Sequence, residues 1–206
     1  MSDAGGAAAK GTATVPPPIP GEAESVALAL VNTTPSGPGG DDGPLSGPDG
    51  AADWLAGRDL GPVPAAGIGA DGVAALADLR AAIRALFTSA ADGDEPDPAA
   101  VGRVNAAAGL APGVPVLEWS AGWRQRWAAA GPGTLGHALA LIARDAIEVV
   151  CGPNGDVLHR CEAHGCERLF FRTHGRRRWC SNACGDRVRV ARHYRLRKAR
   201  RGPAAS

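Results

Sequence analysis

Residues 161–184, CEAHGCERLFFRTHGRRRWCSNAC, decide the fold of the C-terminal part of this chain. Cys161, Cys166, Cys180 and Cys184 follow the spacing C-x4-C-x13-C-x3-C. Structural zinc is tetrahedral and takes thiolates as two close pairs, joined by a segment long enough to turn back. The array therefore predicts a Zn²⁺ site with four cysteine ligands. Such a closed site has no position for water, so the metal is predicted to be structural rather than catalytic.

The segment around the array, residues 156–200, is predicted to form a small zinc-stabilised module of a β-hairpin followed by a helix. Gly165 allows the positive φ that a tight turn between the first two cysteines needs. Residues 168–173 and 176–180 are predicted to pair about a turn that contains glycine. So small a core is expected to unfold without its metal. The predicted core residues are Leu169, Phe170, Phe171, Trp179, Val188 and Tyr194.

Other uses of the cysteines stay open at this point. A histidine could replace one sulfur, or the four sulfurs could bind an iron–sulfur cluster; the candidate histidines are His159, His164 and His174. The fifth cysteine, Cys151, ends an apolar helical pattern and is predicted to be a small buried hydrophobic residue rather than a redox sensor.

The charge of the chain divides near residue 150. Residues 1–150 carry 8 Lys and Arg against 17 Asp and Glu, whereas residues 151–206 carry 14 against 4. The two parts therefore have net charges of −9 and +10, although the whole chain has only +1. This asymmetry is typical of a protein in which one part binds a polyanion.

The basic residues of the C-terminal part are predicted to contact nucleic acid, because arginine neutralises phosphates and reads guanine edges. A merely solvated helix usually mixes both signs, but residues 181–201 contain the single acid Asp186. The candidate contacts are Arg176, Arg177, Arg178, Arg187, Arg189, Arg192, Arg195 and Lys198.

The N-terminal part is predicted to contain a tail and one domain, so the fold class is α+β. Residues 1–20 are rich in Ala, Gly and Pro and are expected to be disordered. Residues 21–152 are expected to form a mainly helical domain with a small β element. Its helices are predicted to begin at the caps Asp71, Asp97 and Thr134 and to end at Gly93, Gly109 and Gly152.

Two segments of this domain are ambiguous. Residues 26–31, VALALV, fit either a buried strand or a helix. Between residues 114 and 127, two short strands compete with a helix. Three tryptophans there, Trp119, Trp123 and Trp127, are predicted to be core or packing residues.

Neither an enzyme nor a membrane protein is indicated. His137 is the only histidine before residue 150 and has no nucleophile motif near it, so a non-enzymatic protein is expected. There is no apolar run of 18 residues and no signal-peptide pattern, so we expect a cytoplasmic protein. Thiols stay reduced in that compartment, which favours metal binding over disulfides.

Two parts of the sequence resemble known families. Cys180-Ser-Asn-Ala-Cys184-Gly185-Asp186-Arg187, after Arg-Arg-Trp and before a basic tail, resembles the CGNR zinc finger. Val31-Asn32-Thr33, Asp53-Trp54-Leu55 and the helix ALALIARDAIEVV resemble the ABATE domain that precedes this finger in bacterial stress-induced transcription regulators. The resemblance covers about residues 22–200. It departs from the family pattern at Asp186, where the finger has Asn, and at Arg172, where an aspartate is usual.

Together these features predict a zinc-dependent regulator that binds duplex DNA through its C-terminal finger. The N-terminal domain is expected to sense a signal or to mediate assembly, including homo-oligomers. The alternatives are a zinc module that binds RNA or the ribosome, and a finger that binds an acidic protein partner. Competition between duplex DNA and structured RNA distinguishes the first alternative.

Overall fold

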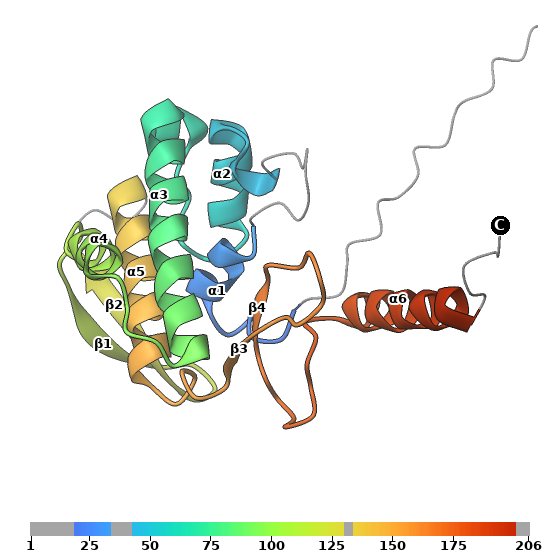
Figure 1. The fold of residues 1–206 in the computed structure, drawn as a ribbon. Helices are drawn as coiled ribbons and strands as arrows, with labels where there is room; N and C mark the ends of the chain where they lie inside the picture. Colours follow the sequence, from blue (N-terminus) through green and yellow to red (C-terminus); the bar gives the residue numbers. More distant parts are fainter. Residues whose placement is uncertain (1–18, 34–42, 130–133, 201–206) are drawn as a thin grey trace, which may run out of the picture.

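The structure, a computed structural model, describes residues 19–33, 43–129 and 134–200, without the side chains of residues 127–129 and 198–200. It has a helical body, two small antiparallel sheets and a long C-terminal helix (Figure 1), which confirms the α+β class. The elements are α1 Val26–Val31, η1 Gly43–Leu45, α2 Pro48–Ala56, α3 Ala65–Asp92, α4 Pro98–Ala108, β1 Gly113–Trp119, β2 Trp123–Ala129, α5 Leu135–Cys151, β3 Leu158–Arg160, β4 Leu169–Phe171 and α6 Asn182–Arg200.

Helix α3 is the centre of the body, because α1, α2, α4 and α5 all pack against it (Figure 1). Its apolar residues recur at helical spacing and turn inward, with Ile83 and Phe87 fully buried. Helix α5 presents the predicted apolar stripe to the same core through Ile142, Ala146 and Val149. None of the helices in the described residues is both long and apolar enough to cross a membrane.

The predicted helix caps are confirmed at two of three positions. The Asp97 side chain accepts a hydrogen bond from the Ala99 N–H, and Thr134 accepts one from the His137 N–H, each at the N-terminus of its helix. The cap predicted at Asp71 is wrong. Helix α3 begins earlier, at Ala65, and has a break at Gly69, where φ is 59°. Asp71 follows this break inside the helix.

The ambiguous segment 26–31 is a helix, α1. Although it has only six residues, it is buried and held at its N-terminus by two side chains. Ser25 accepts a hydrogen bond from the Leu28 N–H, and the Asp145 carboxylate accepts bonds from the Ser25 hydroxyl at 2.6 Å and the Ala27 N–H at 2.7 Å. Burial raises the pKa of Asp145, although these hydrogen bonds oppose the shift.

The second ambiguous segment forms the antiparallel hairpin β1–β2, in which Trp119 is opposite Trp123. Trp119 and Trp123 are not core residues, since their exposed fractions are 66% and 71%, but their rings do pack against each other, as the alternative of packing residues predicted. No second layer covers their face of the sheet within the described residues. The side chain of Trp127 lies outside the part of the chain described.

The hairpin predicted in the C-terminal module has a different partner strand. Strand β4 pairs with β3, which precedes the first cysteine, and not with residues 176–180. Those residues cannot extend as a strand, because Arg177 folds the segment into a turn. Its backbone N–H donates to the His174 carbonyl, and its guanidinium donates to the carbonyls of Trp179 and Cys180.

The C-terminal module is fastened to the body through β4. Leu169 and Phe171 belong to the core of the body rather than to a separate core. The buried Asn32 amide donates to the Leu169 carbonyl at 2.9 Å and accepts from the Leu169 N–H at 3.1 Å. Asn32 therefore satisfies both backbone groups of that residue, as a neighbouring strand would.

Residues 19 and 20 correct the predicted limit of the tail. Ile19 is buried among the cysteines of the module, and the Pro20 carbonyl accepts a hydrogen bond from the Phe171 N–H at 2.9 Å. Residues 1–18 lie outside the described residues. The chain before α1 thus contributes to the module that is about 140 residues away in sequence, and the core of the body in turn includes Leu158, Leu169 and Phe171 of that module.

We expect Asn32→Ala to destabilise the folded chain by about 2–3 kcal/mol, because it leaves two buried backbone groups of Leu169 without partners. For a chain of this size the melting temperature should fall by roughly 5–10 °C. Thermal unfolding of the zinc-loaded protein measures the effect. Asn105→Ala, at an exposed position of α4, is the control and should change little. Equal melting temperatures for both variants would contradict the fastening role of Asn32.

Candidate metal centre and nucleic-acid interface

The four predicted cysteines converge on one point. Their Sγ atoms all lie within 4.8 Å of one another, and no other cluster of potential metal ligands occurs among the described residues. Cys180 Sγ is 3.8 Å from Cys166 Sγ and 3.6 Å from Cys184 Sγ. The sulfurs of Cys166 and Cys184 are 3.7 Å apart. A tetrahedral zinc with Zn–S bonds of 2.3 Å requires sulfur separations of about 3.8 Å. The geometry therefore fits one zinc ion.

Two local turns bring the sulfurs together. Gly165 has φ of 71°, as predicted, and closes the turn between the first pair, where the Cys166 N–H donates to the Ala163 carbonyl at 2.9 Å. In the second pair, Cys180 precedes α6 and Cys184 lies in its first turn. The Ser181 hydroxyl accepts a hydrogen bond from the Cys184 N–H at 3.3 Å and so caps the helix.

The cluster is largely closed to solvent and is rich in donors. Cys161, Cys180 and Cys184 are buried, and Cys166 is half-buried. The Cys180 N–H donates to Cys161 Sγ at 3.4 Å, and Arg187 donates to Cys184 Sγ at 3.6 Å. Donors of this kind stabilise the negative charge that thiolates bring to a metal.

Hydrogen bonds among Cys161, Cys166 and Cys180 shift the pKa of each of these three thiols. Hydrogen bonds from the Cys161 and Cys180 thiols lower the pKa of Cys166 far below its ordinary value. The same network raises the pKa of Cys180, through Cys161 and then Cys166 and burial. Four adjacent sulfurs cannot all be thiolates without a cation between them, so binding of the metal must displace protons.

The alternatives for the ligand set do not fit this arrangement. His159 is on β3, and His164 and His174 are exposed, and none of them joins the cluster. In an iron–sulfur cluster, several irons and bridging sulfides lie between the cysteine ligands. Such a cluster would hold the four cysteine sulfurs farther apart than they are here. All four protein ligands are used, so the ion has no open position for a substrate.

The core beside the metal is smaller than predicted. Phe170 is fully buried against the cysteines, and Trp179 and Val188 pack partly over them. Tyr194 was predicted to belong to this core, which is wrong, because its exposed fraction is 68%. Helix α6 projects away from the body (Figure 1).

Two of the predicted nucleic-acid contacts, Arg177 and Arg178, form hydrogen bonds or ion pairs within the module. The Arg177 guanidinium lies 5.7 Å from the centre of the Phe170 ring and holds the carbonyls of Trp179 and Cys180, at 3.1 and 2.9 Å. Arg178 pairs with Glu162, with Nε at 2.6 Å from the carboxylate. Both arginines therefore have intramolecular partners before any ligand arrives.

Two arginines in the first turns of α6 also have partners. Arg187 donates to the metal-site sulfur of Cys184. Arg189 pairs with Asp186 at 2.6 Å, and its guanidinium lies 5.9 Å from the centre of the Trp179 ring. Asp186, the residue that departs from the family pattern, thus neutralises the positive charge of Arg189, one of the predicted nucleic-acid contacts.

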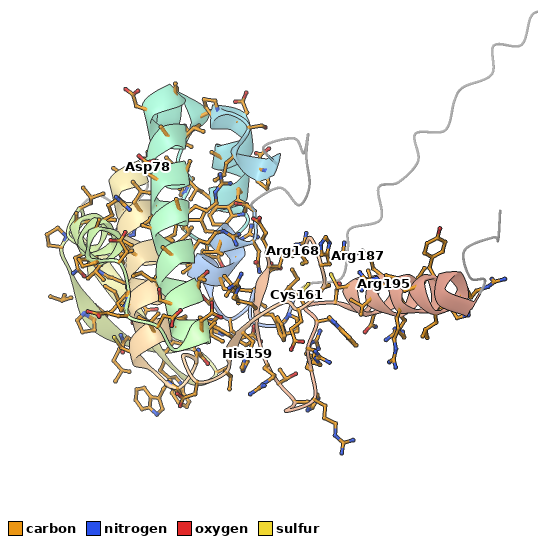
Figure 2. The ribbon with its side chains drawn as sticks, viewed as in Figure 1. Asp78, His159, Cys161, Arg168, Arg187 and Arg195 are labelled. Atoms are coloured by element: carbon orange, nitrogen blue, oxygen red, sulfur yellow. The ribbon has the colours of Figure 1, made fainter. Side chains whose placement is uncertain are left out.

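The remaining arginines are open to solvent. Arg176, Arg192 and Arg195 are exposed, and no acidic side chain of the described residues lies within ion-pair distance of them. Figure 2 shows Cys161 at the base of α6, with Arg187 and Arg195 farther along that helix. Lys198 lies in α6, but its side chain is outside the described part of the structure. Arg197, which was not among the predicted contacts, is also exposed on this helix.

A groove runs between α6 and the turn of the first cysteine pair. Its cationic wall is formed by Arg187, Arg192 and Arg195, and its other lining residues are Glu162, His164, Val188, Ala191 and Leu196. The arginines of three consecutive helical turns thus line the same hollow. Helical periodicity could be predicted from the sequence, but not that Glu162 and His164 form the opposite wall.

The fifth cysteine is not a core residue. Cys151 ends α5 and is exposed, so the prediction of a small buried hydrophobic residue is wrong. It lies at the edge of a mostly apolar hollow of about 250 Å³ between α3, α4 and α5. Cys151 is not part of the cysteine cluster, in agreement with its position outside the array in the sequence.

Two family models match the chain. One, ABATE, is described as "Putative stress-induced transcription regulator" and covers residues 24–153. The other is the CGNR zinc finger and covers residues 158–197. No curated protein matches the chain.

Replacement of one ligand should abolish tight zinc binding, because three thiolates cannot close the tetrahedron. We expect Cys180→Ser to lower the zinc content of the purified protein from one ion per chain to a small fraction. Elemental analysis together with a thiol assay measures this. Cys151→Ser is the matched control and should retain its zinc. A Cys180→Ser protein with full zinc content would exclude this cluster as the site.

Proposed function

The chain belongs to the ABATE family and carries a CGNR zinc finger, and from this premise we propose that it is a zinc-dependent DNA-binding transcription regulator. The finger binds duplex DNA, and the helical body receives a signal or mediates assembly. The protein acts without catalysis of its own, in the cytoplasm where bacterial DNA is found. One observation carries the proposal: a metal-anchored helix with exposed arginines projects freely from an acidic body.

The shape of this helix supports contact with a duplex. The major groove is about 12 Å wide and admits an α-helix. Helix α6 has 19 residues, and beyond Val188 its described side chains are exposed. The zinc site fixes its first turn, so the arginines are presented on a rigid element rather than on a mobile tail.

The arginines divide into two groups with different expected roles. Arg176, Arg192 and Arg195 are free to neutralise phosphates, which supplies affinity that depends on salt. Arg177 and Arg178 are occupied within the module, and we assign them to holding its shape. This division makes the open arginines the stronger candidates for direct contact.

A finger that binds its own acidic body is not favoured by the arrangement of the chain. Helix α6 points away from the body (Figure 1), although the two parts carry opposite charge. RNA remains the second candidate, because exposed Tyr194 among the arginines offers a ring on which an unpaired base could stack.

Removal of two open arginines should weaken DNA binding strongly. For Arg192→Ala/Arg195→Ala in the zinc-loaded full chain, we expect about a 10- to 100-fold loss of affinity. The plot of log K against log salt should become less steep by about 2. Fluorescence anisotropy with duplex DNA measures both. Structured RNA added as a competitor distinguishes the two candidate ligands.

The control is Arg103→Ala/Arg124→Ala, which removes the same charge from exposed positions of the body. It should leave the slope nearly unchanged. Equal losses in both double variants would mean that net charge alone, and not α6, determines binding. Tighter binding of structured RNA than of duplex DNA would favour the RNA alternative.

Asp186 is expected to limit the affinity of this finger. Asp186→Asn removes the ion pair to Arg189 and one negative charge from the binding helix, so affinity for duplex DNA should rise by about fivefold and the salt slope by about 1. The same anisotropy titration measures this, with unchanged zinc content as the test of folding. Asp78→Asn, on the exposed face of α3, is the control. Weaker binding by Asp186→Asn would show instead that Asp186 positions Arg189 for contact.

A further inference from the structure

The hairpin β1–β2 has one apolar face and one charged face. Successive residues of a strand point to opposite faces, so the register that pairs Trp119 with Trp123 and Leu117 with Gln125 puts these four on one side. We call Leu117, Trp119, Trp123 and Gln125 the tryptophan face. Its only polar member is Gln125. The opposite face carries Val116, Glu118, Arg124 and Arg126.

The tryptophan face is open to solvent. Leu117, Trp119 and Trp123 have exposed fractions of 67%, 66% and 71%. The two indole rings lie edge to face, with centroids 5.0 Å apart, so they form one continuous apolar surface. Monomeric proteins rarely leave large apolar groups together in water, and such surfaces mark sites of association.

The hairpin also lacks support from within the chain. Its sheet has only two strands, and among the described residues no other element packs on it extensively. Isolated two-stranded hairpins are marginally stable in water. A second layer over the tryptophan face would supply the packing that this chain does not provide.

We propose that the tryptophan face is a dimer interface, in which it stacks on the same face of a second copy of the chain. A two-fold interface requires a self-complementary patch, and an uncharged apolar face meets that condition. The charged face is suited to contact with water and not to a second copy. Its residues Glu118 and Arg126 form an ion pair at 2.7 Å within the hairpin.

The area available agrees with a reversible dimer. The two tryptophans and Leu117 offer on the order of 400 Å² of apolar surface per chain. Two such faces with their rims reach about 1,000 Å², at the lower end of specific interfaces. We therefore expect a dissociation constant in the micromolar range.

The geometry favours stacked faces over paired strand edges. Pro115 in β1 has no N–H and weakens the free edge of that strand as a template for pairing. Figure 1 places the hairpin at the end of the molecule opposite to α6. A dimer formed there leaves the metal centre and the basic helix of both copies uncovered.

Sedimentation velocity of the zinc-loaded full chain, without nucleic acid, tests the proposal from about 1 to 200 µM. The wild-type protein should shift from its monomer mass of 20.8 kDa to twice that mass. Over the same range the tryptophan emission should move to shorter wavelength as the rings leave water. Trp119→Thr/Trp123→Thr, which keeps strand-forming residues, should remain monomeric and retain its zinc and far-UV spectrum.

Val190→Thr on α6 is the control, since it removes an equally exposed apolar group from another surface. It should dimerise like the wild type. A wild-type chain that stays monomeric throughout the range would overturn the proposal, as would a dimer that persists in the double tryptophan variant. Because no DNA is present, either result leaves the test of DNA binding independent.

Discussion

The closure of four sulfurs around one point is the constraint on which the C-terminal module depends. The strands β3 and β4 have three residues each, and few apolar side chains lie beside the cysteines. Such a small core cannot offset the conformational entropy of the segment, so the metal must supply the missing free energy. It also fixes the first turn of α6, through Cys184, and thereby sets the direction of the whole basic helix.

The finger is nevertheless not an independent module. Asn32 completes the hydrogen bonds of Leu169, Ile19 packs among the cysteines, and Arg84 donates to the carbonyls of both Val31 and Glu167. These contacts join α1 and α3 of the body to the segment that carries the ligands. The body and the metal centre are thus in direct contact, as the proposed role of the body in receiving a signal requires.

What could be predicted from the sequence is what local chemistry determines. The spacing of the cysteines, the positive φ of Gly165 and the caps Asp97 and Thr134 involve neighbours in the chain, and all were found as expected. The partner of β4 and the exposure of Tyr194 and Trp119 depend on residues far away in the chain. Hydrophobic character alone predicts burial, but within the described part of the chain no layer covers these side chains of α6 and the hairpin. The role of Asn32 was missed for the same reason, since a polar residue at the end of an apolar run looks like a turn.

The number of arginines in a basic segment is a poor measure of its capacity to bind phosphate. In this finger Arg177, Arg178, Arg187 and Arg189 are each engaged with a carbonyl, a carboxylate or a thiol. A guanidinium in such a contact must give up its partner before it can bind a new anion, so part of its interaction energy is lost. If the finger binds DNA as proposed, its affinity is therefore determined by the few arginines that the fold leaves open. Asp186 shows how one substitution within a family motif alters that number without touching the metal ligands.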